Sequence, residues 1–165
     1  MNAKSRALNV ASAAILLLIP ISGTAAAGSS ETVPAKAATV TTGSSLGPED
    51  RVTCTIKAAR PNYSGTTITA VGWMSSCRPH APQTCRTETD LLRYYPGPGM
   101  WQVVASGRVN YSCPGPSRVS TAVLHDCESN PVNWSYMTRT YSTIIQDGIP
   151  TSGHVDSDLL NVRCV

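Results

Sequence analysis

The amino-acid sequence predicts an all-β protein: an antiparallel β-sandwich, immunoglobulin-like, with about seven strands and three disulfides. Three observations support this prediction. Apolar and polar residues alternate with a period of two over most of the chain after residue 50, short clusters of Gly, Pro, Asn and Asp interrupt the alternation, and six cysteines are spread among the alternating segments. Such alternation is typical of strands that bury one face, and frequent breakers favour short antiparallel strands joined by turns.

The first 27 residues have the layout of a secretory signal peptide. Lys4 and Arg6 precede an apolar run at residues 10–21, and the small residues 25–27 supply a cleavage pattern. Pro20 interrupts the run before it reaches the ~20 residues that a membrane span needs. We therefore predict a secreted, extracellular protein with no membrane anchor in its mature form.

Residues 28–50 are predicted to be a flexible linker. They are rich in Ala, Thr, Ser and Gly, and they include Pro34 and Pro48 but no large aromatic residue. Such a segment buries too little apolar surface to offset the entropy lost on ordering. The folded domain is then predicted to span residues 51–165, a length that suffices for one hydrophobic core.

The strands are predicted wherever the alternation persists. In residues 51–58, Val52, Cys54, Ile56 and Ala58 alternate with polar residues, and residues 101–113 show the clearest pattern, with Gly107 marking a bend. The other predicted strands are residues 66–74, 91–95, 118–124, 134–145 and 159–164. Turns are predicted at residues 61–62, 78–83, 96–99, 114–116, 130–131 and 147–153. Residues 87–93 have the pattern of no more than one helical turn.

The six cysteines all follow the predicted leader, and an even number in an exported chain predicts three disulfides. The simplest pairing joins neighbours in the chain and then its two ends: Cys77–Cys85, Cys113–Cys127 and Cys54–Cys164. A link between Cys54 and Cys113 across the sheets is the alternative. No pair of Cys-x-x-Cys spacings occurs, so neither a zinc site nor another cofactor is predicted.

Charge and composition exclude one class of partner. The formal net charge is +3, and the basic residues are scattered instead of forming the stripe expected of a nucleic-acid binder. The mature region contains far more Arg than Lys, and the leader is rich in Ala, as in bacteria with high GC content. We predict a bacterial protein that does not bind nucleic acid.

Motifs for catalysis are weak, so we predict that the protein is not an enzyme. His125 and His154 each lie near an aspartate, but adjacent pairs do not indicate a catalytic triad, which is a geometry of residues distant in sequence. The motif His-Glu-x-x-His does not occur. A small secreted hydrolase that uses His125 or His154 is kept as an alternative.

The segment between Cys77 and Cys85 is the first candidate binding site, with Arg78 and His80 as its recognition residues. If the two cysteines are joined, they close a nine-residue ring stiffened by prolines. The ring resembles the inhibitory loop of Bowman–Birk-type serine protease inhibitors, with Pro82 followed by Gln at the matching place. Pro79 stands where that family carries its specificity residue, and Arg78 lies one position earlier. The resemblance implies an alternative function, protease inhibition through this loop.

The second candidate binding site is formed by Tyr94 and Tyr95, next to the turn at residues 96–99. Aromatic residues beside a Gly/Pro turn at a sandwich end suit stacking on a sugar or insertion into a partner's pocket. Alternation places Trp101 on the buried face and requires the two tyrosines to point to opposite faces.

As a whole, the leader, the Arg and Ala bias and the cysteine layout resemble the small secreted cysteine-containing β-sandwich proteins of actinobacteria. That resemblance implies an extracellular β-sandwich and carries no active site. We therefore predict a non-catalytic binding or interaction module that recognises an extracellular protein or glycan through its end loops.

Overall fold

The structure, a computed structural model, describes residues 34–43, 47, 50–115, 118–127 and 132–164. The predicted signal peptide lies outside the described residues. Within them the protein is all-β, with no helix, and so none that could cross a membrane. The described residues form ten strands: β1 (Ala35–Thr41), β2 (Thr53–Ala59), β3 (Asn62–Ser64), β4 (Thr67–Arg78), β5 (Thr84–Tyr95), β6 (Met100–Ser106), β7 (Val119–Leu124), β8 (Trp134–Gln146), β9 (Ile149–Asp156) and β10 (Leu160–Val162).

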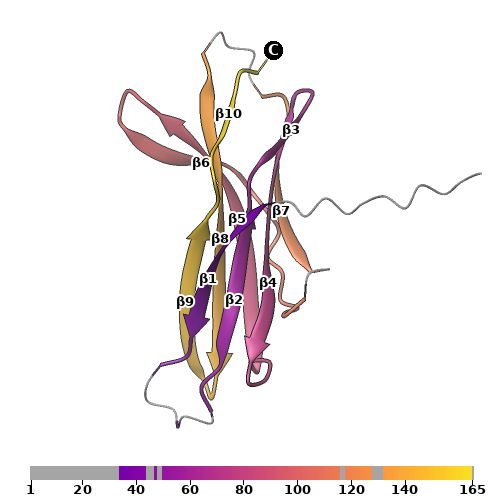
Figure 1. The fold of residues 1–165 in the computed structure, drawn as a ribbon, viewed down its shortest axis with the longest axis vertical. Coiled ribbons are helices and arrows are strands. Elements are labelled where there is room, and N and C mark those ends of the chain that lie inside the picture. The colour runs from indigo at the N-terminus through magenta and orange to yellow at the C-terminus, as the bar shows by residue number, and fades with distance from the viewer. Residues whose placement is uncertain (1–33, 44–46, 48–49, 116–117, 128–131, 165) are drawn as a thin grey trace, which may run out of the picture. The chain divides into compact units, whose positions relative to one another are not determined.

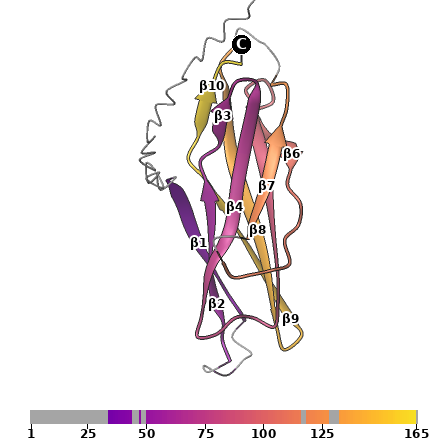
Figure 2. The same cartoon turned by 90° about the vertical axis from the view of Figure 1, so that its right-hand side faces the viewer.

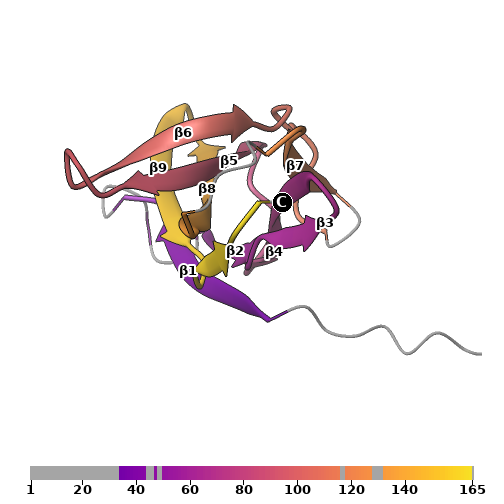
Figure 3. The same cartoon turned by 90° about the horizontal axis from the view of Figure 1, so that it is seen from above.

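The strands make two antiparallel sheets packed face to face (Figures 1 and 2). Sheet A has the order β1-β2-β4-β3, with β7 also paired to β4, and sheet B has the order β10-β8-β5-β6, with β9 also paired to β8. The chain crosses between the sheets after β4, β6 and β7. The view from above shows the two layers, and it shows the β5–β6 hairpin extending sideways beyond them (Figure 3).

The long strands β4 and β8 organise the sheets, because each holds two short strands on one edge. β2 and then β3 follow one edge of β4, and a tight turn at Gly65, with φ of +61°, reverses the chain into β4. A positive φ of this kind suits glycine because it has no Cβ. β9 and β10 follow one edge of β8 in the same way.

The interior contains two hydrophobic clusters separated by polar residues. One cluster includes Val40, Ile56 and Ile144, and the other includes Leu91 and Tyr136, all buried. The buried polar residues are mainly hydroxyl-bearing and come from both sheets: Thr87, Thr89, Ser120, Thr138, Thr140 and Ser142. The hydroxyls of Thr89, Thr138 and Thr140 have no hydrogen-bond partner among the described residues.

Gly72 on β4 faces this polar layer and sets how closely the sheets approach. A Cβ at this position would overlap Oγ1 of Thr140 and lie 2.6 Å from Oγ1 of Thr89. Only glycine allows β4 to lie this close to β5 and β8. The alternating strands therefore meet through small and hydroxyl-bearing residues at the middle of the sandwich and through large apolar residues on either side.

The linker prediction was wrong for residues 35–41, which form β1. Every residue of β1 pairs with β2, and the strand contributes Val40 to the interior. The segment has too few large apolar residues to fold alone, but pairing with β2 satisfies its backbone groups along one edge. Residues 28–33 lie outside the described residues.

All three predicted disulfides were wrong. The observed bridges are Cys54–Cys77, Cys85–Cys113 and Cys127–Cys164. Cys54 and Cys77 are direct partners in the β2–β4 register, and Thr87 forms a bridge with Asn110, which brings Cys113 back to β5. Proximity in space, set by strand register, decides the pairing, whereas the prediction used proximity in sequence.

Candidate functional site

Arg78 is the last residue of β4 and His80 lies in the loop that leads from it to β5, and both are exposed. No disulfide closes this loop, because Cys77 is bonded to Cys54 and Cys85 to Cys113. Three hydrogen bonds of Gln83 hold it instead. Nε2 of Gln83 donates to Oδ1 of Asp147 at 2.9 Å, the Asp147 backbone N–H donates to Oε1 of Gln83 at 3.0 Å, and the Gln83 backbone N–H donates to Oε1 of Gln146 at 3.4 Å. The ring behind the protease-inhibitor hypothesis is therefore absent.

Tyr94 and Tyr95 lie far from this loop, at the other end of β5. β5 has twelve residues, which at ~3.3 Å per residue make it about 36 Å long. The four predicted binding residues therefore do not form one site. Of the two end loops predicted to bind a partner, only the one at the β5–β6 hairpin carries a group of aromatic side chains.

The tip of the β5–β6 hairpin, residues 92–103, is called the arm below. One face of the arm carries Tyr94 and Trp101. The two residues are register partners, and their ring centroids lie 5.3 Å apart at an interplanar angle of 53°. Val103 extends the apolar surface and is 52% exposed. The sequence pattern placed Trp101, and the apolar residues that alternate with it, on the buried face. That prediction is wrong for Val103 and for Trp101, which is only half-buried. The β-bulge between Leu91 and Leu92 lies directly beside this part of β6.

The opposite face of the arm carries Tyr95, as the predicted alternation requires. Its ring lies 5.5 Å from that of Trp134, and the guanidinium of Arg93 lies over both rings, 4.5 Å and 4.8 Å from their centroids. Arg93 also donates to the Tyr95 hydroxyl, with Nε at 2.8 Å and Nη2 closer still. Desolvation lowers the pKa of Arg93, but hydrogen bonds to Tyr95 and Tyr136 outweigh it, so the net shift is upward. These contacts hold the β5 strand of the arm against Trp134 of β8.

A second candidate site lies on the outer face of sheet B, where strand register aligns side chains of β5, β8 and β9 in rows. The three rows, each given in the order β5, β8, β9, are Arg86–Thr143–Ser152, Glu88–Tyr141–His154 and Asp90–Arg139–Asp156. Adjacent strands lie ~4.8 Å apart and successive same-face residues ~6.7 Å apart. The central ring of Tyr141 is therefore surrounded by polar side chains.

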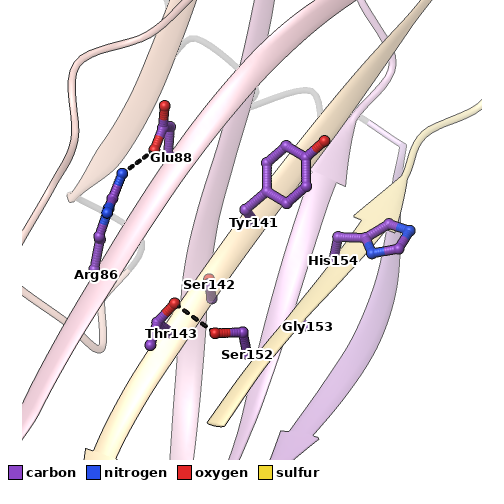
Figure 4. A pocket seen from close by; sticks show the side chains of 8 residues that line it. All are labelled: Arg86, Glu88, Tyr141, Ser142, Thr143, Ser152, Gly153 and His154. Atoms are coloured by element: carbon purple, nitrogen blue, oxygen red, sulfur yellow. Dashed lines mark hydrogen bonds and ion pairs between the residues drawn. The ribbon is translucent and has the colours of Figure 1, made fainter. Parts of the chain in front are cut away.

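The first two rows line an open groove of about 470 Å³, which we call the Tyr141 groove (Figure 4). Its lining residues are Arg86, Glu88, Tyr141, Ser142, Thr143, Ser152, Gly153 and His154. Nη2 of Arg86 lies 2.6 Å from Oε2 of Glu88, and the hydroxyls of Thr143 and Ser152 lie 2.8 Å apart. The rings of Tyr141 and His154 lie 5.8 Å apart, tilted by 44°.

The third row is held by charge. Arg139 donates through Nε and Nη2 to the two carboxylate oxygens of Asp156, at 2.6 and 2.7 Å. The hydrogen bond from Arg139 lowers the pKa of Asp156, and the charges of Arg139, His154 and Lys36 add to the effect. The same hydrogen bond is the largest contribution to the raised pKa of Arg139, which also interacts with the Tyr141 hydroxyl.

The sequence did not point to this groove, because residues 147–153 were predicted to be a turn. Without β9 there was no register to align Ser152 and His154 with β8. The alternation at positions 139, 141 and 143 of β8 is visible in the sequence, and in the structure these three residues face outward between β5 and β9.

Among the described residues, neither His125 nor His154 forms a Ser-His-Asp arrangement. His125 is exposed just beyond the end of β7, whereas His154 lies on β9. Ser152, His154 and Asp156 share one face, but Ser152 bonds to Thr143 and both oxygens of Asp156 bond to Arg139. A triad needs the base to bond both the nucleophile and the carboxylate. The described residues also contain no cluster of three or more His, Cys, Asp or Glu side chains that could hold a metal ion.

Comparison with known proteins finds no matching family model, curated protein or solved structure.

Proposed function

We propose that the protein is a secreted, non-catalytic binding module of immunoglobulin-like sandwich architecture, and that the arm anchors it to an extracellular protein. Three disulfides within the described residues are consistent with an extracellular location. The observation that carries the proposal is the arm itself: a hairpin that extends beyond the sandwich with the Tyr94–Trp101 pair on one face and Tyr95 on the other (Figure 3).

The chemistry of the arm suits a protein partner. Trp, Tyr, Met and Arg are the residues enriched at protein interfaces, and Met100 and Val103 add exposed apolar surface, at 48% and 52%. The tilt between Tyr94 and Trp101 leaves no shared flat platform on which one sugar ring could stack. Because Tyr95 and Arg93 hold the β5 strand of the arm against Trp134, the arm loses little conformational entropy on binding.

The test compares variants of the full chain, secreted by a bacterial host and collected from the medium. Each is used to capture proteins from bacterial culture medium, and the affinity for any captured protein is then measured after purification. We expect Trp101→Ala and Tyr94→Ala each to weaken binding by roughly 30-fold, the effect of removing an interface hot spot worth ~2 kcal/mol.

Tyr111→Ala is the matched control, because Tyr111 is 69% exposed and lies outside the arm. Circular dichroism and the thermal midpoint establish that each variant is folded. Equal affinity for the wild-type chain and both arm variants would exclude the arm as the anchor, and capture of no protein by the wild-type chain would count against the function itself.

A further inference from the structure

The Tyr141 groove is separate from the arm. Tyr94 and Glu88 are six residues apart on β5, or ~20 Å, and no residue lines both sites. The groove also differs in chemistry, because it is built from hydroxyl, carboxylate, guanidinium and imidazole groups around one tyrosine. We propose that it binds a neutral carbohydrate, with the apolar face of one pyranose ring stacked on Tyr141.

The position of Tyr141 supports stacking. It occupies the middle of its row, with Glu88 on one side and His154 on the other, and its side chain remains 38% exposed on an otherwise polar face. An exposed aromatic ring of this kind presents a flat apolar surface beside polar groups. A pyranose has the complementary form, with C–H groups on its faces and hydroxyls around its edge.

The charges in and beside the groove favour a neutral ligand. Within the groove Arg86 is paired with Glu88, and in the adjacent row Arg139 is paired with Asp156 through two hydrogen bonds. Each guanidinium thus already has an anionic partner, so an added phosphate, sulfate or carboxylate would compete with a carboxylate of the protein. Paired charges still offer N–H donors and carboxylate acceptors at fixed positions. A sugar hydroxyl can bind both kinds of group, because it accepts a hydrogen bond from an N–H and donates one to a carboxylate.

The remaining polar groups extend this pattern. Ser152 and Thr143 form a hydroxyl pair at one end of the groove, and the imidazole of His154 has no hydrogen bond to another described residue. The groove thus offers both donors and acceptors around Tyr141 (Figure 4), and it is open to solvent. Such an open site accepts an internal residue of a polysaccharide as readily as its end.

The groove is also rigid before any ligand binds. β8 lies in the middle of sheet B between β5 and β9, and beneath the groove Thr87 and Ser142 hydrogen-bond at 3.1 Å inside the sandwich. A site built on paired strands needs little ordering when it binds, which helps a weakly held, strongly hydrated ligand.

The test is isothermal titration calorimetry of the full secreted chain with soluble neutral hexasaccharides of glucose, N-acetylglucosamine, xylose and mannose. A hexamer of galacturonic acid is the anionic probe. We expect at least one neutral probe to bind with a dissociation constant in the micromolar to low millimolar range, and the anionic probe to bind more weakly or not at all.

Variants then locate the site. Tyr141→Ala should weaken binding by about tenfold or more, whereas Tyr141→Phe, which keeps the ring, should retain affinity within about threefold. Tyr111→Ala and the arm variant Tyr94→Ala should bind as the wild-type chain does, so a failure of the arm proposal and a failure of the groove proposal are distinguishable.

Three results would overturn the groove proposal. One is the absence of binding to every neutral probe at millimolar concentration, and another is equal affinity for the wild-type chain and Tyr141→Ala. The third is tighter binding of the galacturonic acid hexamer than of all neutral probes, which would assign the groove to an anion.

Discussion

The outer faces of the two sheets follow the same alternation and present different chemistry. On sheet A, one row runs Ala37–Lys57–Trp73–Val119, and the neighbouring outward residues are mostly threonine and valine. On sheet B, the rows contain two arginines, three carboxylates and a histidine around Tyr141. Lys57 is the only charged residue within the row on sheet A, and it forms no ion pair with another described residue.

The difference separates what stabilises the sandwich from what it presents to partners. The inward residues of both sheets are apolar at the two clusters and small or hydroxyl-bearing between them. They are similar in kind because each sheet packs against the other. Outward residues carry no such constraint. The two sheets should therefore respond alike to changes on the inside and differently to changes on the outside.

The largest effect is expected at Gly72, where the sheets meet. Gly72→Val should destabilise the protein by about 4 kcal/mol or more, because its Cβ would overlap Oγ1 of Thr140 and crowd Thr89. Urea unfolding followed by tryptophan fluorescence measures the change. Gly97→Ala is the control, since nothing lies within 4 Å of a Cβ there, and it should change stability by less than about 0.5 kcal/mol. A stable Gly72→Val variant would show that the two sheets do not depend on this close approach.

Smaller changes in stability are expected among the buried hydroxyl-bearing residues between the sheets, and they should have opposite signs at Thr140 and Thr87. Thr140→Val should stabilise the protein by about 1 kcal/mol, because a methyl group of similar size replaces a buried hydroxyl that has no hydrogen-bond partner among the described residues. Thr87→Val should destabilise by a similar amount, because it breaks the hydrogen bond with Ser142. Unfolding curves of the two variants are compared with the wild type. A loss of stability in both would mean that the Thr140 hydroxyl is hydrogen-bonded in solution.

The same buried hydroxyls explain why the sequence predicted only part of the fold. The all-β class and most of β2, β4, β6, β7, β8 and β10 followed from visible alternation, although the strand predicted at residues 101–113 ends at Ser106. The first half of β5 did not, because its inward residues Thr87 and Thr89 are polar by type although both are buried. Period-two reasoning needs apolar residues on one face, and a threonine layer hides that face.

Edge strands were the other part that sequence patterns could not predict. β1 contains one fully buried apolar residue, Val40, and β9 contains Pro150 and Gly153, which look like a turn. An edge strand tolerates proline because one side of its backbone pairs with no neighbour. Gly153 lies against Val40, where a Cβ would come within 2.7 Å of the valine side chain. Since β9 forms one side of the Tyr141 groove, missing the strand meant missing the site.

The opposite case is the arm, which local sequence did predict in part. Tyr94 and Tyr95 were expected on opposite faces beside the turn at residues 96–99, and the structure confirms this. Their rings contact Trp101 and Trp134, and these two residues lie at different distances from the tyrosines in the sequence. Trp101 follows within the same hairpin, but Trp134 comes from β8, and only the sheet register places it beside Tyr95.

The smallest expected effect is on the pH dependence of stability, and it distinguishes the outer face of sheet B from that of sheet A. The pKa of Asp156 is lowered, chiefly by its hydrogen bond from Arg139, so the folded protein favours the ionised carboxylate. A lowered pKa contributes stability that is present above the unfolded value, ~3.9, and is lost as the pH falls through the lower, folded value. Arg139→Gln should remove this contribution. Because the ion pair is partly exposed to solvent, we expect the contribution to be about 0.3 to 1 kcal/mol. The difference in unfolding free energy between pH 7 and pH 3 should shrink accordingly.

Lys57→Gln provides the comparison on sheet A, because it removes the same charge from a residue without a carboxylate partner among the described residues. Its stability should change between pH 7 and pH 3 as that of the wild type does. If Lys57→Gln and Arg139→Gln shift the pH dependence equally, net charge accounts for the effect and the paired rows of sheet B do not. If only Arg139→Gln shifts it, the acid sensitivity originates in the sheet whose outer face carries the Tyr141 groove, through the Arg139–Asp156 pair beside Tyr141.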